Sequence, residues 1–129
     1  MKAWIVLADA ASAHPDGTFS LLRGGITELN VPKGQPLVFQ AAFVARVLGS
    51  IGDAGEHRLE IRVTNEDGQP VAPNVEGSFS IPAGGGATQV VASFNLRFPE
   101  YGRYTFWLTI DRQQADSWEI RAQEPPATR

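Results

Sequence analysis

The chain has 129 residues, a formal net charge of −3 and no cysteine. This length suits one domain, expected over residues 1–122, and 43% hydrophobic residues suffice for its core. The composition excludes disulfides and cysteine-based zinc sites, and it provides neither a basic surface for nucleic acid nor the roughly 18-residue apolar run of a membrane helix.

The opening stretch, MKAWIVLADAASA, is open to two interpretations, a cleaved export signal or the first strand of the domain. Lys2 gives a positive start, and the small residues 11–13 resemble a cleavage site. A signal also needs an apolar stretch of roughly 7 to 15 residues, and the carboxylate of Asp9 interrupts this one. We therefore expect a strand and, with it, a cytoplasmic protein.

The strand expected over residues 4–11 would pair with residues 18–29. Between them lies Asp16-Gly17, a pair favoured in two-residue hairpin turns because glycine adopts positive φ freely and aspartate tolerates it. The sequence therefore predicts an N-terminal hairpin.

Three further runs have the patterns of strands. Residues 37–48 are apolar on both faces, as expected for a central strand. Residues 57–64 alternate apolar and polar side chains, and residues 87–98 do the same. Turn-forming residues separate the runs, at 32–34, 52–55, 65–68, 82–86 and 99–102. Short strands at this spacing predict an all-β sandwich or barrel.

The stretch EYGRYTF, residues 100–106, is similar to the acidic-x-Gly-x-Tyr-x-Cys signature of immunoglobulin-like domains, with Phe106 at the position of the second cysteine. The resemblance implies that the Tyr104 hydroxyl bonds back to nearby backbone at the start of the penultimate strand. It also places Phe106, Leu108 and Ile110 in the core. We therefore expect an immunoglobulin-like β-sandwich of about seven to nine antiparallel strands without a disulfide.

A second resemblance concerns the N-terminal third. The stretches LADAA, residues 7–11, and DGTFSLLRGGI, residues 16–26, resemble the opening hairpin of a family of small uncharacterised bacterial proteins. This resemblance implies a fold and a bacterial or phage setting, and it carries no activity.

Residues with catalytic potential are few. Ser12, His14 and Asp16 lie close in sequence but belong to one hairpin tip, whereas the members of a catalytic triad converge from separate segments. His14 and His57, the two histidines, do not by themselves define a metal site. We therefore expect no enzyme activity and no cofactor.

Acidic residues in turns raise the alternative of calcium binding. Four of them would have to meet at one end of the sandwich: Asp53, Asp67, Asp111 and Asp116. The turn at residues 65–68 lacks the spacing of a calcium-binding loop, and aspartate also favours turns because it bonds its own backbone. We therefore expect no metal site.

Two tryptophans provide the candidate interaction surface. Trp107 is expected to face outward between Thr105 and Thr109, and Trp118 follows on the next strand. Together they could form a flat platform that anchors a protein contact or stacks on a sugar. The alternative is that the chain's own N-terminus or a long loop covers Trp107.

These observations predict a non-catalytic protein-interaction or assembly module. Its partner would be an unidentified protein or a second copy of the chain, and the alternative is a carbohydrate-binding module. Residues 123–129, which contain Pro125-Pro126, are expected to form a flexible tail.

Overall fold

The computed structural model describes residues 1–126, which form ten strands and one short 3-10 helix. The elements are β1 (Lys2–Ala8), β2 (Ala10–Ala13), β3 (Phe19–Leu22), β4 (Glu28–Asn30), β5 (Leu37–Gly49), η1 (Ile51–Asp53), β6 (Gly55–Thr64), β7 (Val75–Ile81), β8 (Gly86–Phe98), β9 (Gly102–Ile110) and β10 (Gln113–Gln123). The predicted all-β class is confirmed. No helix in the described part of the chain has the length and apolar character needed to cross a membrane.

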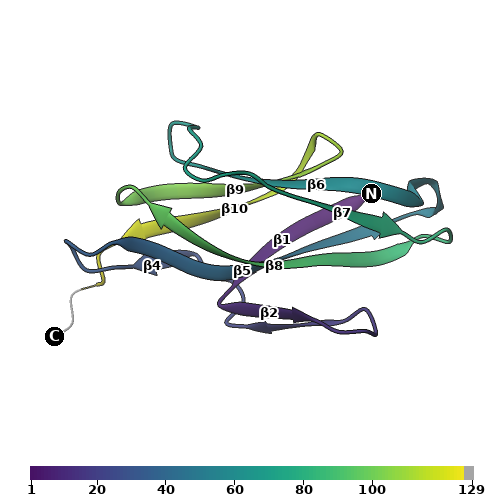
Figure 1. Cartoon of the computed structure of the whole chain (residues 1–129), viewed down its shortest axis with the longest axis horizontal. Coiled ribbons are helices and arrows are strands. Elements are labelled where there is room, and N and C mark those ends of the chain that lie inside the picture. Colours follow the sequence, from purple (N-terminus) through teal and green to yellow (C-terminus); the bar gives the residue numbers. More distant parts are fainter. Residues whose placement is uncertain (127–129) are drawn as a thin grey trace.

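Two sheets face each other and enclose the core (Figure 1). One has the order β1-β5-β8 and the other the order β4-β10-β9-β6-β7. Neighbouring strands are antiparallel, except that β4 runs parallel to β10. The molecule is thus a β-sandwich, and the eight strands of its two facing sheets agree with the seven to nine expected, while β2 and β3 form a separate hairpin.

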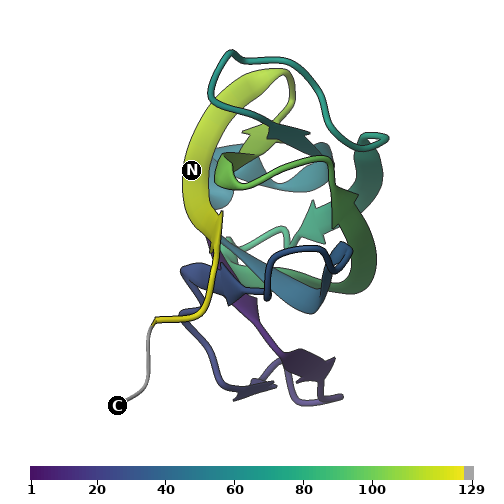
Figure 2. The same ribbon diagram turned by 90° about the vertical axis from the view of Figure 1, so that its left-hand side faces the viewer.

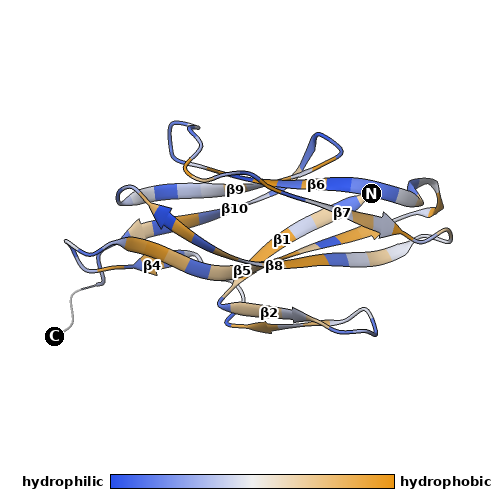
Figure 3. Cartoon of the chain, in the orientation of Figure 1, coloured by the Kyte–Doolittle hydropathy of each residue, from blue (hydrophilic) through white to orange (hydrophobic). Residues whose placement is uncertain are grey.

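Alternating apolar side chains from both sheets fill the space between them, and Figure 3 colours the apolar residues along these strands orange. Phe106 is 1% exposed, and its ring centroid lies 6.2 Å from that of Phe39 and 5.4 Å from that of Phe94. Leu108 and Ile110 are also buried. Aromatic packing therefore occupies the place where the sequence resemblance would put a disulfide.

The predicted tyrosine corner is present at the start of β9. The Tyr104 hydroxyl donates a hydrogen bond to the Glu100 carbonyl at 2.6 Å, and the ring stacks on Phe98 with centroids 4.0 Å apart. Burial of the hydroxyl raises the pKa of Tyr104 above its ordinary value. This contact fixes the connection between β8 and β9, which belong to different sheets.

The predicted pairing of the N-terminal hairpin is wrong. Strand β1 pairs with β5, from Lys2 opposite Leu48 to Ala8 opposite Ala42. A two-stranded hairpin buries little apolar surface, whereas this pairing buries Ile5 and Leu7 against the second sheet. The N-terminal segment is thus a strand, with a different partner from the one expected.

Strands β2 and β3 form a separate hairpin that lies below the sandwich in Figure 1. His14 N donates a hydrogen bond to Thr18 O, so the loop between these two residues consists of residues 15–17. Gly17, the last of the three, adopts a φ of 83°. A type I turn followed by a residue with positive φ is a common three-residue hairpin loop. The predicted two-residue turn is therefore one residue too short.

The β2–β3 hairpin covers part of the three-stranded sheet from outside (Figure 2). Gln89 Nε2 on β8 donates to Gly17 O at 2.8 Å, and the Arg46 guanidinium lies 5.9 Å from the Phe19 ring centroid. Beneath the hairpin, Ala42 and Val44 of β5 are buried. This cover explains why β5 is apolar on both faces, as its sequence indicated.

The C-terminal strand extends further than predicted. Gln123, expected in the flexible tail, ends β10, and its carbonyl accepts a hydrogen bond from Val31 N at 2.9 Å. Its side chain donates to Asn30 Oδ1 at 3.1 Å. The rest of the predicted tail includes residues 127–129, which lie outside the described residues.

Candidate functional site

The side of the five-stranded sheet that is turned away from the core carries most of the predicted surface residues, and we call it the outer face. Cross-strand register assigns side chains to this face, since residues directly opposite each other point to the same side. Its central members are Arg58, Glu60, Arg62, Thr64, Glu76, Thr105, Trp107, Thr109, Ser117 and Glu119.

Trp107 lies in the middle of the outer face. It is opposite Arg62 on β6 and Ser117 on β10, with Thr105 and Thr109 on either side along β9. Its indole Nε1 donates a hydrogen bond to the Thr64 hydroxyl at 2.8 Å. Because this bond satisfies its polar atom, the half-buried indole presents apolar surface to solvent.

Trp118 does not share this face, so the predicted two-tryptophan platform is not formed. It lies opposite Phe106 and packs against the core. Its Nε1 donates to the Ile26 carbonyl at 2.7 Å. The indole thus closes the side of the sandwich beneath the segment that leads into β4.

A β-bulge in β10 is the cause of this difference. Gln114 pairs with Thr109, but Asp116 pairs with Leu108, so Ala115 is an extra residue. In a continuous register Trp118 would lie opposite Thr105, on the outer face. A shift of one residue turns each later side chain to the other side of a sheet, and the bulge therefore turns Trp118 inward.

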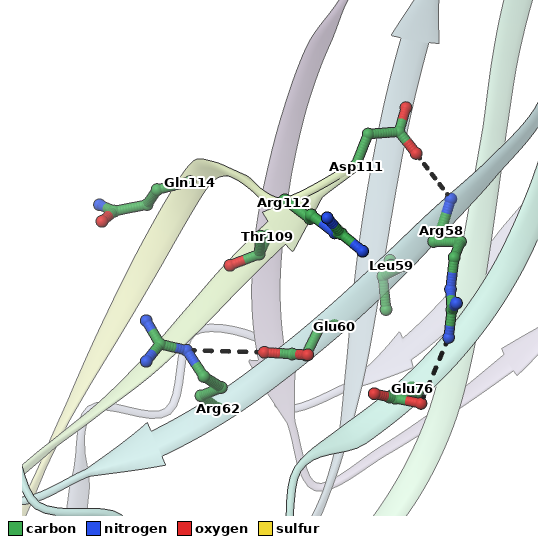
Figure 4. Close-up of a pocket in the computed structure, with 9 residues that line it drawn as sticks. All are labelled: Arg58, Leu59, Glu60, Arg62, Glu76, Thr109, Asp111, Arg112 and Gln114. Carbon is green, nitrogen blue, oxygen red and sulfur yellow. Dashed lines mark hydrogen bonds and ion pairs between the residues drawn. The ribbon is translucent and has the colours of Figure 1, made fainter.

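A shallow depression of about 750 Å³ lies beside Thr109 on the outer face (Figure 4). Its polar lining combines arginines with carboxylates. Arg58 contacts Glu76 at 3.5 Å and Arg62 contacts Glu60 at 3.7 Å. Glu60 and Glu76 lie directly opposite each other, a like-charge arrangement that is unfavourable by itself, and the two arginines offset it.

The β9–β10 turn forms one wall of this depression. Asp111 and Arg112 both adopt positive φ, 50° and 69°, as a two-residue type I′ turn requires. Arginine is not favoured in this conformation. The Asp111 side chain anchors the turn, since its Oδ1 accepts a hydrogen bond from Arg58 N at 2.9 Å.

His57 lies behind the same turn, between two acceptors. Its Nδ1 is 2.5 Å from Asp111 Oδ2, and its Nε2 is 2.6 Å from the Asp53 carbonyl. Both ring nitrogens must donate, which requires the imidazolium form. The hydrogen bond to Asp111, followed by that to Asp53, raises the pKa of His57 above its ordinary value of 6.5. The hydrogen bond from Arg58 N, followed by that from His57, lowers the pKa of Asp111.

Ser12, His14 and Asp16 do not form a triad. His14 Nε2 lies 2.7 Å from the hydroxyl of Ser20. The Asp16 carboxylate instead accepts a hydrogen bond from the hydroxyl of Thr18 and another from its backbone N–H, and these bonds, the first more than the second, lower the pKa of Asp16. The aspartate thus orders the hairpin loop.

The four acidic turn residues do not gather at one end. Asp53 precedes β6 and Asp67 follows it, so these two lie at opposite ends of the strand. Asp111 contacts His57 near the first end, and Asp116 accepts a hydrogen bond from Ile5 N. Within residues 1–126, no three histidine or acidic side chains form a group that could hold a metal ion.

Local sequence patterns did not predict the charged depression, nor Thr64 as the hydrogen-bond acceptor for Trp107. The alternation in residues 57–64 already placed the arginines and Glu60 on one side of β6. Glu76 and Asp111 join them through pairing of strands that are distant in sequence, and no local pattern reports this pairing.

Two solved structures contain a region of similar fold. A glycosyl hydrolase family 2 member from Bacteroides cellulosilyticus matches with a TM-score of 0.45 and 16% identity, over 64% of this chain and 12% of that protein. A proposed β-galactosidase from Bacteroides fragilis matches with a TM-score of 0.41 and 15% identity, over 64% of this chain and 14% of that protein. The match spans only a small part of the length of either protein.

No curated protein matches the sequence significantly. A family model does match it, over residues 3–123, which is nearly the whole described chain. The chain belongs to the family of unknown function DUF6941.

Proposed function

We propose that the protein is a non-catalytic interaction module whose outer face binds another protein, with Trp107 at the centre of the contact. The observation that carries the proposal is the hydrogen bond from Trp107 to Thr64 at 2.8 Å. It holds the indole in place before binding, so little conformational freedom remains to be lost when a partner arrives. Tryptophan is one of the residues enriched in interaction hot spots.

The charges around Trp107 favour a protein partner. Arginines and carboxylates alternate on neighbouring strands, and their exposed ion pairs contribute little to stability by themselves. Such a mixed pattern gives specificity and orientation to a contact. An apolar centre with a polar rim is the usual anatomy of a protein interface.

Carbohydrate binding is the alternative function, and it now depends on Trp107 alone. Trp118 faces the core, so a sugar would have one indole for stacking. The threonines beside Trp107 and the nearby Arg62 offer hydrogen-bonding groups for hydroxyls. A protein contact accounts better for the charged pairs further from the indole.

The test is a comparison of variants in affinity capture from cells that contain the protein. Trp107→Ala should weaken binding of the captured partner by about 2 kcal/mol, or roughly 30-fold. The matched control is Gln40→Ala, an exposed residue of the other sheet, which should bind like wild type. Thermal unfolding of each variant checks that it is folded.

The same variants applied to a glycan array separate the two functions. Binding of the partner protein that Trp107→Ala weakens, without a glycan signal, agrees with the proposal. A glycan signal that requires Trp107 would favour the carbohydrate alternative. Equal capture by wild type and Trp107→Ala would contradict the protein-binding proposal, and a glycan signal that Trp107→Ala leaves unchanged would contradict the alternative.

A further inference from the structure

Strand β8 is a free edge of the three-stranded sheet along thirteen residues. It pairs with β5 without a bulge, from Gly49 opposite Gly86 to Leu37 opposite Phe98. No strand in the described part of the chain pairs with its other side. The edge is therefore long and free of bulges.

The geometry identifies which backbone groups are free. Ile5 N and Leu7 O of β1 bond away from β5, so their opposite residues Ala45 and Phe43 must bond toward β8, because antiparallel residues alternate between their two neighbours. Val90 and Ala92 of β8, which lie opposite Ala45 and Phe43, therefore direct their backbone N–H and C=O groups to β5. The intervening residues direct N–H and C=O groups to the free edge: Ala87, Gln89, Val91, Ser93, Asn95 and Arg97.

This edge lacks the devices that normally prevent strands from pairing between molecules. Such edges are kept short, bulged, or protected by proline and charge. The sequence GATQVVASFNLRF contains no proline and no lysine, and its one charged residue is Arg97 near the end. The core-facing side chains Val90, Ala92, Phe94 and Leu96 are only partly buried. The edge therefore offers both unpaired backbone and apolar surface.

We propose that β8 pairs antiparallel with β8 of a second copy of this chain, around a two-fold axis at Ala92. With this axis all thirteen residues overlap, because Gly86 then lies opposite Phe98 of the second copy. The register also pairs the free-edge residues with one another, Val91 with Ser93 and Gln89 with Asn95. The product is a continuous six-stranded sheet with a self-complementary interface, as two-fold symmetry requires.

The side chains fit this pairing on both faces. On the core side, Val90 lies opposite Phe94 of the second copy, and aromatic pairs with β-branched residues stabilise sheets. Ala92 lies opposite itself at the axis, where its small side chain permits close approach. Arg97 lies opposite Ala87, so no like charges face each other. These features favour a second copy over an unrelated strand as the occupant.

The first test is the mass in solution of full-length wild type and of Val91→Pro. The Val91 N–H points to the free edge, so proline removes no bond to β5 and blocks only the partner strand. Across about 1 μM to 1 mM, wild type should approach twice the 13.9 kDa of the chain, while Val91→Pro should remain a monomer. Val91→Thr keeps the N–H and should dimerise like wild type.

The second test uses the absence of cysteine in the chain. Ala92→Cys places a thiol opposite its own copy, within the Cα separation that a disulfide requires, and should cross-link under mild oxidation. Val90→Cys is the matched control, because four residues separate it from the thiol of the second copy along the strand, and it should not cross-link. This test remains informative if Val91→Pro fails to fold.

A wild-type protein that stays monomeric throughout the series would overturn the proposal. So would a dimer that Val91→Pro leaves intact, or equal cross-linking of the two cysteine variants. The outcome does not depend on the outer face, since Trp107→Ala should leave the mass unchanged. Failure of either proposal can therefore be recognised separately.

Discussion

The two edges of the three-stranded sheet differ although both border the same central strand. At the β1 edge, Ile5 N bonds the Asp116 carboxylate at 2.9 Å, and Leu7 O accepts a hydrogen bond from Gly25 N at 2.8 Å. Both side chains are buried. The β8 edge has no such cover within the described chain, and its core-facing side chains are partly exposed.

The difference shows that closure of an edge depends on segments remote in sequence. Asp116 reaches Ile5 because the bulge at Ala115 turns it away from the outer face. The same bulge directs Trp118 inward, where it holds Ile26. Through this one extra residue, both Asp116 and Trp118 help to cover the β1 edge. The β8 edge has no corresponding backbone contacts within the described chain.

The largest expected effect compares one substitution at the two edges. Leu7→Ala removes a side chain that is 0% exposed and should lower the free energy of unfolding by about 2–5 kcal/mol. Leu96→Ala, at the half-buried β8 edge, should cost less than half as much. Urea unfolding of both variants, each combined with Val91→Pro, measures the two losses in free energy without a contribution from dimerisation. Equal losses would mean that the β8 edge is as well covered as the β1 edge.

A smaller effect is expected from the carboxylate that caps β1. Asp116→Ala leaves the Ile5 N–H without its acceptor and should cost about 1–3 kcal/mol. Glu119→Ala, an exposed position of the same strand, is the control and should change stability by no more than about 0.5 kcal/mol. Chemical unfolding of the two variants checks the prediction, which fails if they are alike.

The smallest effect concerns pH. The raised pKa of His57 means that its stabilisation is complete below the ordinary value of 6.5 and is lost as pH rises through the folded-state pKa. The lowered pKa of Asp111 means that its stabilisation is present above the ordinary value of 3.8 and is lost as pH falls. Both contributions are therefore present together between these two values.

The titration of His57 should affect the β1 edge of the three-stranded sheet. His57 bonds the Asp53 carbonyl, and the Asp53 carboxylate lies 3.5 Å from the amino terminus that precedes β1. The thermal midpoint of wild type should exceed that of His57→Gln at pH 6, and the difference should shrink by pH 9. The dimer mass should not change over this range, because no histidine or carboxylate lies on β8. A constant difference in midpoint would contradict the assignment of a charged His57.

Local patterns in the sequence were sufficient for the fold class and for one detailed contact. Alternation in residues 57–64 and 87–98, with turn residues between strands, predicted an all-β sandwich or barrel, and the resemblance at residues 100–106 implied the burial of Phe106. The motif at residues 100–106 predicted the Tyr104 corner. These features depend on a period of two residues or on a contact four residues away, so neighbouring positions carry the information.

Three other features were decided only by the tertiary structure. Strand β1 pairs with β5 instead of its neighbour in sequence because that pairing buries both Ile5 and Leu7. Trp118 faces inward because a bulge of one residue reverses the side on which it lies. The edge of β8 is open because the segments that close the sheet, from β10 and residues 24–27, lie on the β1 side. Each depends on long-range pairing, which alternation along a single strand does not specify.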